Sequence, residues 1–341
     1  MEKVFLKNNQ SKAISLIRVI STLSIVLCHI FQGLDNELAW WLNIGVQVFL
    51  FMSGFLIANS NYKNNIEYIK KRLIRITISY WIFLIIILPI YSTTVDISMQ
   101  QVIIYFLGLQ GFKGPNIPGL EHLWFISVIL VCYIIGAYMN GLRNKINTWD
   151  EFKFWKRVVS SCIFIQLLFI PINISYAAGV ATFTTGYLIS FRYKFCIPKL
   201  LIKILTPIVF ITTSIRILFV YIYPLNSGFI GKVFNIIYYP WSKMLLGMFL
   251  FIIMYEYFSK KIYTIKFLNK TLKYIENISY EIYLVHQVII IGPLSLLWYT
   301  NNLFINLCII GIMILSGSKI LSIISNKINK VINSSIIIKS Y

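Results

Sequence analysis

Long apolar runs separated by short polar and basic segments dominate the pattern of this chain of 341 residues. A helix needs roughly 20 apolar residues to cross a bilayer. Ten runs approach that length: 13–33, 40–59, 75–94, 120–140, 158–174, 175–191, 204–223, 234–257, 277–298 and 303–324. The pattern predicts an all-α, polytopic membrane helix bundle of about ten transmembrane helices. It further predicts a membrane domain of residues 1–325 and a tail of residues 326–341.

The distribution of Lys and Arg sets the expected orientation of these runs. If the N-terminus is in the cytoplasm, 25 Lys and Arg residues lie in cytoplasmic segments or at their edge. The segments on the other side of the membrane contain two, Lys113 and Lys232. Basic residues concentrate in cytoplasmic loops of membrane proteins. We therefore expect both termini, including the tail, in the cytoplasm.

Composition agrees with a membrane protein. The chain is 58% hydrophobic and 12% charged, whereas soluble domains are about a quarter charged. The net charge of +20 is spread over the segments between apolar runs, so it does not form one basic patch and does not indicate a nucleic-acid partner. We expect a multi-pass protein of a bacterial cell membrane, with the lipid bilayer as its surroundings.

Two costly residues, Arg18 and His29, interrupt the first apolar run. They are eleven positions apart, about three helical turns, so both side chains leave the same face of a helix. A guanidinium in hydrocarbon costs roughly 3 kcal/mol or more unless it faces protein, water or an anion. The pair indicates a polar cavity inside the bundle. The alternative is an Arg that reaches the headgroups and a His that is hydrogen-bonded in the core.

The chain has only three histidines, His29, His122 and His286, and all lie at or inside predicted spans. His122 opens its span next to Glu121. Histidine titrates near neutral pH and suits proton transfer. Metal binding is the rival use, but the histidine and carboxylate spacings typical of metal sites are absent, and we expect no metal.

One face of the ninth run carries Ser279, Tyr283 and His286 at positions i, i+4 and i+7. This spacing places them on one stripe of a helix. Such residues line sites, and they also join membrane helices by hydrogen bonds. From this helix alone the two interpretations are equally supported.

Before the third run stands Lys71-Arg72-Leu73-Ile74-Arg75. Arg72 and Arg75 are three positions apart and face one way, at an expected helix start where backbone N–H groups also attract anions. The segment suits a phosphate clamp, or it is ordinary basic flanking of a span. In the second run, Ser53-Gly54 predicts close approach of another backbone.

Together these pieces resemble the acyltransferase 3 family, the integral membrane acyltransferases that modify bacterial surface polysaccharides. The matching segments run in order from about residue 14 to 290: Arg18 and His29 as an Arg-x10-His pair, Gly45–Ile57, Arg72 to Tyr80-Trp81, His122-Leu123-Trp124-Phe125-Ile126-Ser127 with Tyr133, and Ser279–His286. The sequence departs from the common pattern in two regions. Gln47 stands where many members carry an acid, and Ile129 and Leu130 occupy the region of a mid-chain Glu.

The resemblance implies transfer of an acyl group, most often acetyl from acetyl-CoA, to a sugar hydroxyl. It implies that His29 and Arg18 are catalytic and that Arg72 and Arg75, with Lys71, contact the acyl-CoA. The acceptor, a surface or capsular polysaccharide or its precursor, would then meet side chains of the later motifs. These are His122, Trp124, Glu121, Ser279, Tyr283 and His286. The alternative role of His122, Trp124, Tyr283 and His286 is to hold His29 in its tautomer.

Two mechanistic roles are open for His29: general base on the acceptor hydroxyl, or carrier of the acyl group as an acyl-imidazole.

Two other functions of the protein also remain open. A transporter or flippase for a glycan or acyl intermediate would also place polar residues inside the membrane, although the internal repeats typical of transporters are absent. A structural subunit of a polysaccharide synthase is the third possibility.

Overall fold

All the regular secondary structure that the computed structural model describes is helical. The structure describes residues 6–58, 65–112, 114, 116–144, 173–223, 228–261 and 268–338, together with scattered residues between 156 and 167. No strand occurs in these ranges. The prediction of an all-α chain is therefore confirmed for the described residues.

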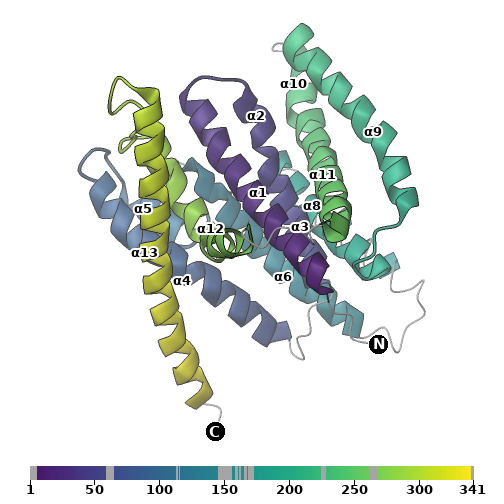
Figure 1. The fold of residues 1–341 in the computed structure, drawn as a ribbon, viewed down its shortest axis with the longest axis horizontal. Helices are drawn as coiled ribbons and strands as arrows, with labels where there is room; N and C mark the ends of the chain where they lie inside the picture. Colours follow the sequence, from purple (N-terminus) through teal and green to yellow (C-terminus); the bar gives the residue numbers. More distant parts are fainter. Residues whose placement is uncertain are drawn as a thin grey trace. The chain divides into compact units, whose positions relative to one another are not determined.

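The helices follow one another along the chain as labelled in Figure 1. Their bounds are α1 (Asn8–Gly33), α2 (Leu38–Leu42), α3 (Ile44–Ile57), α4 (Asn65–Tyr91), α5 (Met99–Phe106), the 3-10 turn η1 (Glu121–Leu123), α6 (Trp124–Asn144), α8 (Ile174–Tyr193), α9 (Lys199–Ile217), the π-helical turn η3 (Leu218–Ile222), α10 (Gly228–Val233), the π-helical turn η4 (Phe234–Tyr238), α11 (Tyr239–Lys261), α12 (Leu268–Ile290) and α13 (Leu303–Ile338).

Seven helical stretches among the described residues are long and apolar enough to cross a membrane. They are Asn8–Gly33, Leu38–Ile57, Arg72–Tyr91, Glu121–Leu142, Lys199–Ile222, Gly228–Lys261 and Leu303–Ile332. Helices α8 and α12 cover most of the sixth and ninth predicted spans, and the fifth, 158–174, lies largely outside the described residues. A polytopic membrane protein is thus confirmed, while the count of ten and the cytoplasmic termini stay predictions.

Three helix boundaries differ from those expected. Helix α4 begins at Asn65, so Arg72 and Arg75 lie in its interior, and the prediction that they stand at a helix N-terminus is wrong. Helix α12 ends at Ile290 and not near residue 298, because Gly292 takes a positive φ of 102° and Pro293 follows it. Helix α13 continues to Ile338, through most of the predicted tail. Apolar runs mark the part of a helix that meets lipid, whereas the helix itself continues into polar sequence.

The chain divides into two compact units, each described here by itself. The first consists of residues 1–21, 44–65 and 131–269, and the second of residues 22–43, 66–130 and 270–341. Helices α1 and α6 each contribute one part to each unit. All three histidines belong to the second unit.

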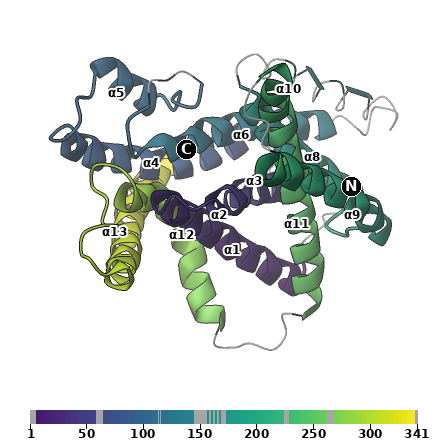
Figure 2. The same cartoon turned by 90° about the horizontal axis from the view of Figure 1, so that it is seen from above.

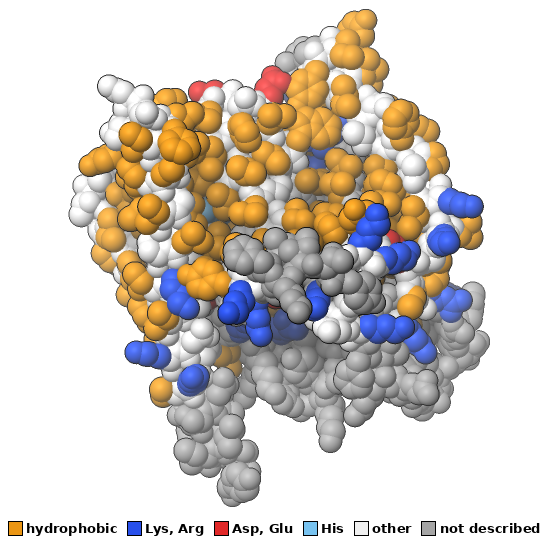
Figure 3. Space-filling model, viewed as in Figure 1, with side chains coloured by type: hydrophobic (Ala, Val, Ile, Leu, Met, Phe, Trp, Pro, Cys, Tyr) orange, Lys and Arg blue, Asp and Glu red, His pale blue; other side chains and the backbone are white. Residues whose placement is uncertain are grey.

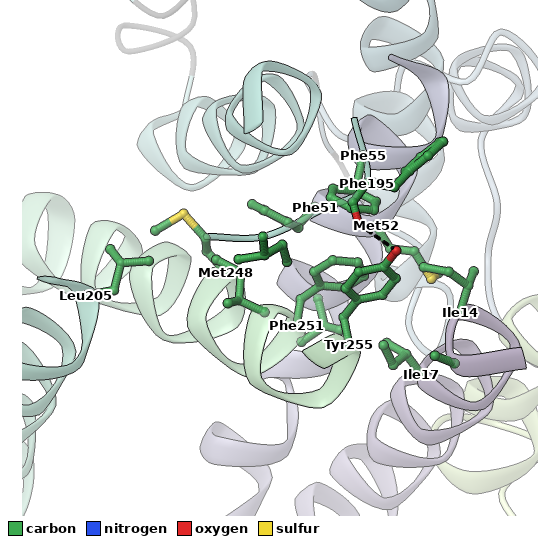
Figure 4. Close-up of a cluster of buried hydrophobic side chains, with 14 residues drawn as sticks. Ile14, Ile17, Phe51, Met52, Phe55, Phe195, Leu205, Met248, Phe251 and Tyr255 are labelled. Carbon is green, nitrogen blue, oxygen red and sulfur yellow. Dashed lines mark hydrogen bonds between the residues drawn. The ribbon is translucent and has the colours of Figure 1, made fainter. Parts of the chain in front are cut away.

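An aromatic core holds the first unit together (Figure 4). The rings of Phe51 and Phe251 lie 4.9 Å apart, and Phe55 packs on both Phe251 and Tyr255 at 5.2 Å. Aromatic pairs at such distances add to the stabilisation that comes from burial alone. The Tyr255 hydroxyl donates a hydrogen bond of 3.0 Å to the Phe195 carbonyl oxygen, drawn as the dashed line. The phenol is therefore not left without a partner in the apolar core.

Helices α3 and α8 approach each other at two glycines of this unit. A Cβ atom on Gly54 would lie 1.9 Å from the Phe183 carbonyl oxygen, and one on Gly186 would lie 2.3 Å from that of Phe51. Only glycine fits at either position. The expected close approach of a backbone at Ser53-Gly54 is confirmed.

In the second unit, α12 packs against α13, and the two helices lie side by side in Figures 1 and 2. Ile278, Ile282 and Ile290 of α12 form a buried cluster with Ile310 and Ile314 of α13. The apolar face of α12 is thereby buried, and its polar residues are left for the other neighbours within the unit.

Large hydrophobic side chains are exposed along several helices. Phe210 on α9 is 72% exposed and Phe304 on α13 is 74% exposed. In the view of Figure 3, hydrophobic side chains cover much of the surface, and Lys and Arg gather apart from them. Apolar surface on this scale is typical of contact with lipid.

Candidate functional site

The three histidines of the chain come together in the second unit. The ring centroid of His286 lies 5.0 Å from that of His29 and 5.1 Å from that of His122, and His29 lies 6.4 Å from His122. His286 and His122 are buried, and His29 is half-buried. Residues up to 257 positions apart in sequence thus form one cluster of imidazoles, which we call the imidazole cluster.

Hydrogen bonds to oxygen atoms place one proton on each ring. His122 Nε2 lies 3.1 Å from the Leu284 carbonyl oxygen, and His286 Nδ1 lies 2.7 Å from that of Tyr283. His29 Nδ1 lies 2.9 Å from Gln32 Oε1. An oxygen of this kind accepts only, so in each case the ring nitrogen is the N–H donor.

The opposite nitrogen of each ring therefore carries the lone pair. His122 Nδ1 and His286 Nε2 are buried and have no hydrogen-bond partner among the described residues. A buried polar atom without a partner costs about 1–3 kcal/mol. Such atoms next to a half-buried histidine are typical of a site that receives hydrogen-bond donors from a ligand.

Tyr283 links His122 to α12. Its hydroxyl donates a hydrogen bond to the His122 carbonyl oxygen, and its ring lies 5.3 Å from the His122 ring. Phe125 packs on Tyr283 at 5.2 Å, and Trp124 packs edge-on against Phe125 at 6.3 Å. The first turn of α6 is thereby fixed on α12 through the contact of Phe125 with Tyr283.

The chain leading to His122 is held in place at Gly119. Gly119 and Gly292 have φ angles of +80° and +102°, and a Cβ on Gly292 would lie 2.8 Å from the Gly119 Cα. Both positions therefore need glycine. The crossing joins the segment before η1 to the segment after α12, and so brings His122 beside His286.

Tyr105 of α5 anchors the same segment. Its hydroxyl accepts a hydrogen bond of 2.9 Å from the Ile117 N–H, and its carbonyl oxygen accepts one of 2.7 Å from Tyr80. Burial raises the pKa of the Tyr105 phenol to about 12. The group therefore stays a neutral hydroxyl, able to hold the segment at physiological pH.

Glu121 is tied to α12 through Gln287. Gln287 Nε2 donates a hydrogen bond of 2.7 Å to Glu121 Oε2. Glu121 is exposed while Gln287 is buried. The Glu121 carboxylate therefore lies beside the imidazole cluster. Glu121 precedes His122 in the sequence, and its hydrogen-bond donor Gln287 follows His286.

Arg75, one of the basic pair of α4, lies near a buried carboxylate of α12. Ser79 donates a hydrogen bond of 3.1 Å to the buried carboxylate of Glu281, and Arg75, one turn before Ser79, lies within electrostatic range of that carboxylate. Arg75 is exposed and Arg72 is half-buried. Glu281 precedes His286 by five residues, about 7.5 Å along a helix. The guanidinium of Arg75 thus belongs to the same α4–α12 interface that leads to the cluster.

Three other expected site residues are Arg18, Ser279 and Lys71. Arg18 is half-buried on the part of α1 that belongs to the first unit, and Ser279 bonds to the Glu276 carbonyl oxygen of its own helix. The side chain of Lys71 lies outside the described residues. Within the described part of the chain, no three His, Cys, Asp or Glu residues are placed to hold a metal ion.

Sequence reasoning missed Gln32 and Gln287. A signal existed for Gln32, because residues three apart on a helix are neighbours on its surface, and His29 was already a candidate. Gln287 directly follows His286, but its partner Glu121 is 166 residues away. No local pattern reveals that contact.

Apolar helices of membrane length around buried imidazoles define a polytopic membrane protein with a polar site inside a helical unit. Comparison with known families identifies the class. The family model described as an acyltransferase domain, of the acyltransferase 3 family, matches residues 11–323. The chain belongs to this family and is a membrane acyltransferase. Comparison with curated proteins and with solved structures gave no match.

Proposed function

We propose that the protein is an O-acyltransferase of the bacterial plasma membrane. It moves an acyl group, in our proposal acetyl, from cytoplasmic acyl-CoA to a hydroxyl of a surface or capsular polysaccharide or of its precursor. The imidazole cluster carries the proposal, because a neutral imidazole nitrogen beside further lone pairs is suited to take a proton from a hydroxyl. The membership of the family supports the acyl transfer itself.

In this proposal His29 is the general base. Its Nε2 removes the proton of the acceptor hydroxyl while the oxygen attacks the thioester carbonyl carbon. The new C–O bond forms, the C–S bond breaks, and the CoA thiolate leaves and takes up the proton from the imidazolium. General base catalysis of this kind contributes about 10²–10⁴-fold to a rate. Attack by Nε2 itself, giving an acyl-imidazole, is the competing role.

The donor side of the proposal uses cations. Arg72 and Arg75 bind phosphate groups of the acyl-CoA, with Lys71 beside them, because guanidinium forks match phosphate oxygens. Arg18 neutralises charge on the donor or on the developing thiolate. The helix N-terminus plays no part, since both arginines lie within α4.

The acceptor side uses the remaining groups of the cluster. His122 Nδ1 and His286 Nε2 accept hydrogen bonds from hydroxyls of the sugar, and Glu121 receives one at the exposed edge. Trp124, Tyr283 and Ser279 complete the lining in this proposal. A polyhydroxylated acceptor supplies the donors that two buried lone pairs require.

A strain that lacks the gene tests the proposal. Proton NMR of its surface glycan should show no O-acetyl signals, and complementation with the wild-type chain should restore them. Complementation with His29→Ala should not, although the variant reaches the membrane at the normal level. Cys308→Ala, an exposed position on α13, serves as the matched control and should restore the signals.

The same experiment separates the rival functions. A structural subunit of a synthase predicts loss of the polymer and not of the ester. A flippase predicts loss of polymer outside the cell with acylated precursor retained inside. Unchanged O-acetyl signals in the deletion strain would refute the acyltransferase proposal for this glycan.

A further inference from the structure

Gln32 lies at the end of α1, one turn after His29. Its amide oxygen Oε1 is 2.9 Å from His29 Nδ1. Gln32 itself is exposed, whereas His29 is half-buried against His122 and His286. The amide of Gln32 therefore contacts Nδ1 of the His29 ring at the exposed edge of the cluster.

The contact decides where the single proton of the neutral ring resides. An amide oxygen only accepts hydrogen bonds, so Nδ1 carries the proton and Nε2 carries the lone pair. The role of a ring nitrogen in proton transfer is set by the hydrogen bond that the other nitrogen makes. With Gln32 in place, Nε2 is the basic atom.

The other two imidazoles of the cluster offer His29 no N–H donor. His122 and His286 have their own protons committed to backbone carbonyl oxygens, and their remaining nitrogens are buried acceptors without partners among the described residues. A proton on His29 Nε2 would remove the lone pair that a general base needs.

We propose that Gln32 is a positioning residue, which holds His29 in the tautomer protonated at Nδ1 and so leaves Nε2 as the basic atom. The tautomer itself follows from the geometry alone. Only its effect on catalysis rests on the proposed acyl transfer. Gln32 belongs to none of the motifs identified in the sequence.

The chain is well suited to a direct test, because it contains only three histidines and hence six ring nitrogens. Purified protein labelled with 15N-histidine, in lipid nanodiscs, should give three protonated and three unprotonated nitrogen signals at neutral pH. His122→Asn and His286→Gln assign the rings. In the wild type we expect His29 Nδ1 to be protonated and Nε2 unprotonated.

Three substitutions then examine the contact. Gln32→Leu removes the acceptor oxygen, so the His29 signals should move toward those of the Nε2-protonated tautomer while the His122 and His286 carbonyl-bonded N–H signals persist. Gln32→Glu keeps an acceptor oxygen and should retain the wild-type tautomer. Gln100→Leu, at an exposed position in the first turn of α5, is the control and should leave all six signals unchanged.

Activity provides the second measurement. Gln32→Leu should lower kcat about ten- to hundredfold, as the loss of an orienting partner typically does, with the KM for acyl-CoA unchanged. Gln32→Glu should restore kcat, with the acid limb of the pH profile moved to higher pH because a carboxylate stabilises the imidazolium. The other titratable groups in contact with His29 or its neighbours are His122, His286 and Tyr283, with Glu121 beside His122, and all are unchanged in these variants.

The outcomes separate the inference from the proposed function. If His29 is protonated at Nε2 in the wild type, or if Gln32→Leu leaves its tautomer unchanged, the inference is overturned. If the tautomer shifts as expected but no variant and no wild-type protein transfers an acyl group, the inference holds and the proposed function fails.

Discussion

The two units of the chain differ in the chemistry of their buried polar groups, although each has buried atoms without a hydrogen-bond partner among the described residues, such as Ser21 Oγ in the first and Tyr91 Oη in the second. In the first unit, polar side chains between the packed helices bond to each other, as Thr182 does to Gln47 at 2.6 Å and Tyr187 to Asn140 at 2.8 Å. In the second unit, His122 and His286 keep buried nitrogens that have no partner among the described residues. Paired polar groups fix helices in place, whereas two buried imidazole nitrogens beside a third histidine can accept hydrogen bonds from a ligand. We therefore interpret the first unit as scaffold and place the chemistry in the second.

The largest expected effect of a substitution concerns the scaffold. Gly54→Val places a side chain where the Phe183 carbonyl oxygen already lies. Overpacking costs about 1–3 kcal/mol even where side chains can adjust, and a backbone atom adjusts less. We expect little folded protein in the membrane, measured by immunoblot and by thermal unfolding of the purified chain.

Gly311→Ala is the matched control for that variant, because nothing lies within 4 Å of the Cβ that it adds. Its membrane level and melting temperature should equal those of the wild type. Normal accumulation of Gly54→Val would show that α3 and α8 are not packed through this glycine.

The next effect separates activity from stability in the second unit. His286→Leu removes a lone pair that we assign to the acceptor site and leaves the helix carbonyls bonded within α12. We expect activity to fall about 100-fold while the free energy of unfolding changes by less than about 1.5 kcal/mol. Acetyl transfer and thermal unfolding, measured on one preparation, check both values. A large loss of stability with normal specific activity would make His286 part of the scaffold.

The smallest effect is expected at the basic pair of α4. Arg75→Ala should raise the KM for acyl-CoA about tenfold with little change in kcat, because a hydrogen bond to a charged group contributes about 1.5–3 kcal/mol. Steady-state kinetics over a range of acyl-CoA concentrations provide the test. Lys199→Ala, an exposed cation at the start of α9, should leave the KM unchanged. A fall in kcat alone would exclude donor binding as the role of Arg75.

Much of the cluster could be predicted from the sequence. Helical spacing placed Tyr283 and His286 on one stripe, and both indeed contact His122. The prediction rested on local periodicity, which the backbone obeys. Ser279 shares the stripe but bonds within its own helix, because spacing fixes the direction of a side chain and not its partner.

The other features of the site depend on contacts between residues that are distant in sequence. The tautomer of His122 follows from the Leu284 carbonyl oxygen, 162 residues away, and no pattern around His122 indicates it. The start of α4 at Asn65 was missed because its first turns are polar and basic, and hydrophobicity identifies only the part of a helix that lipid surrounds. The crossing at Gly119 and Gly292 likewise requires the fold.

The most direct test of the central claim is acyl transfer by purified protein. Wild-type chain in nanodiscs, given radiolabelled acetyl-CoA and the de-O-acetylated surface glycan of its host, should transfer the label to the glycan. Purified His29→Ala, with the same melting temperature, should transfer it at a rate at least 100-fold lower by the usual scale of base catalysis. Transfer by His29→Ala at the wild-type rate would contradict the assignment of His29 as the base.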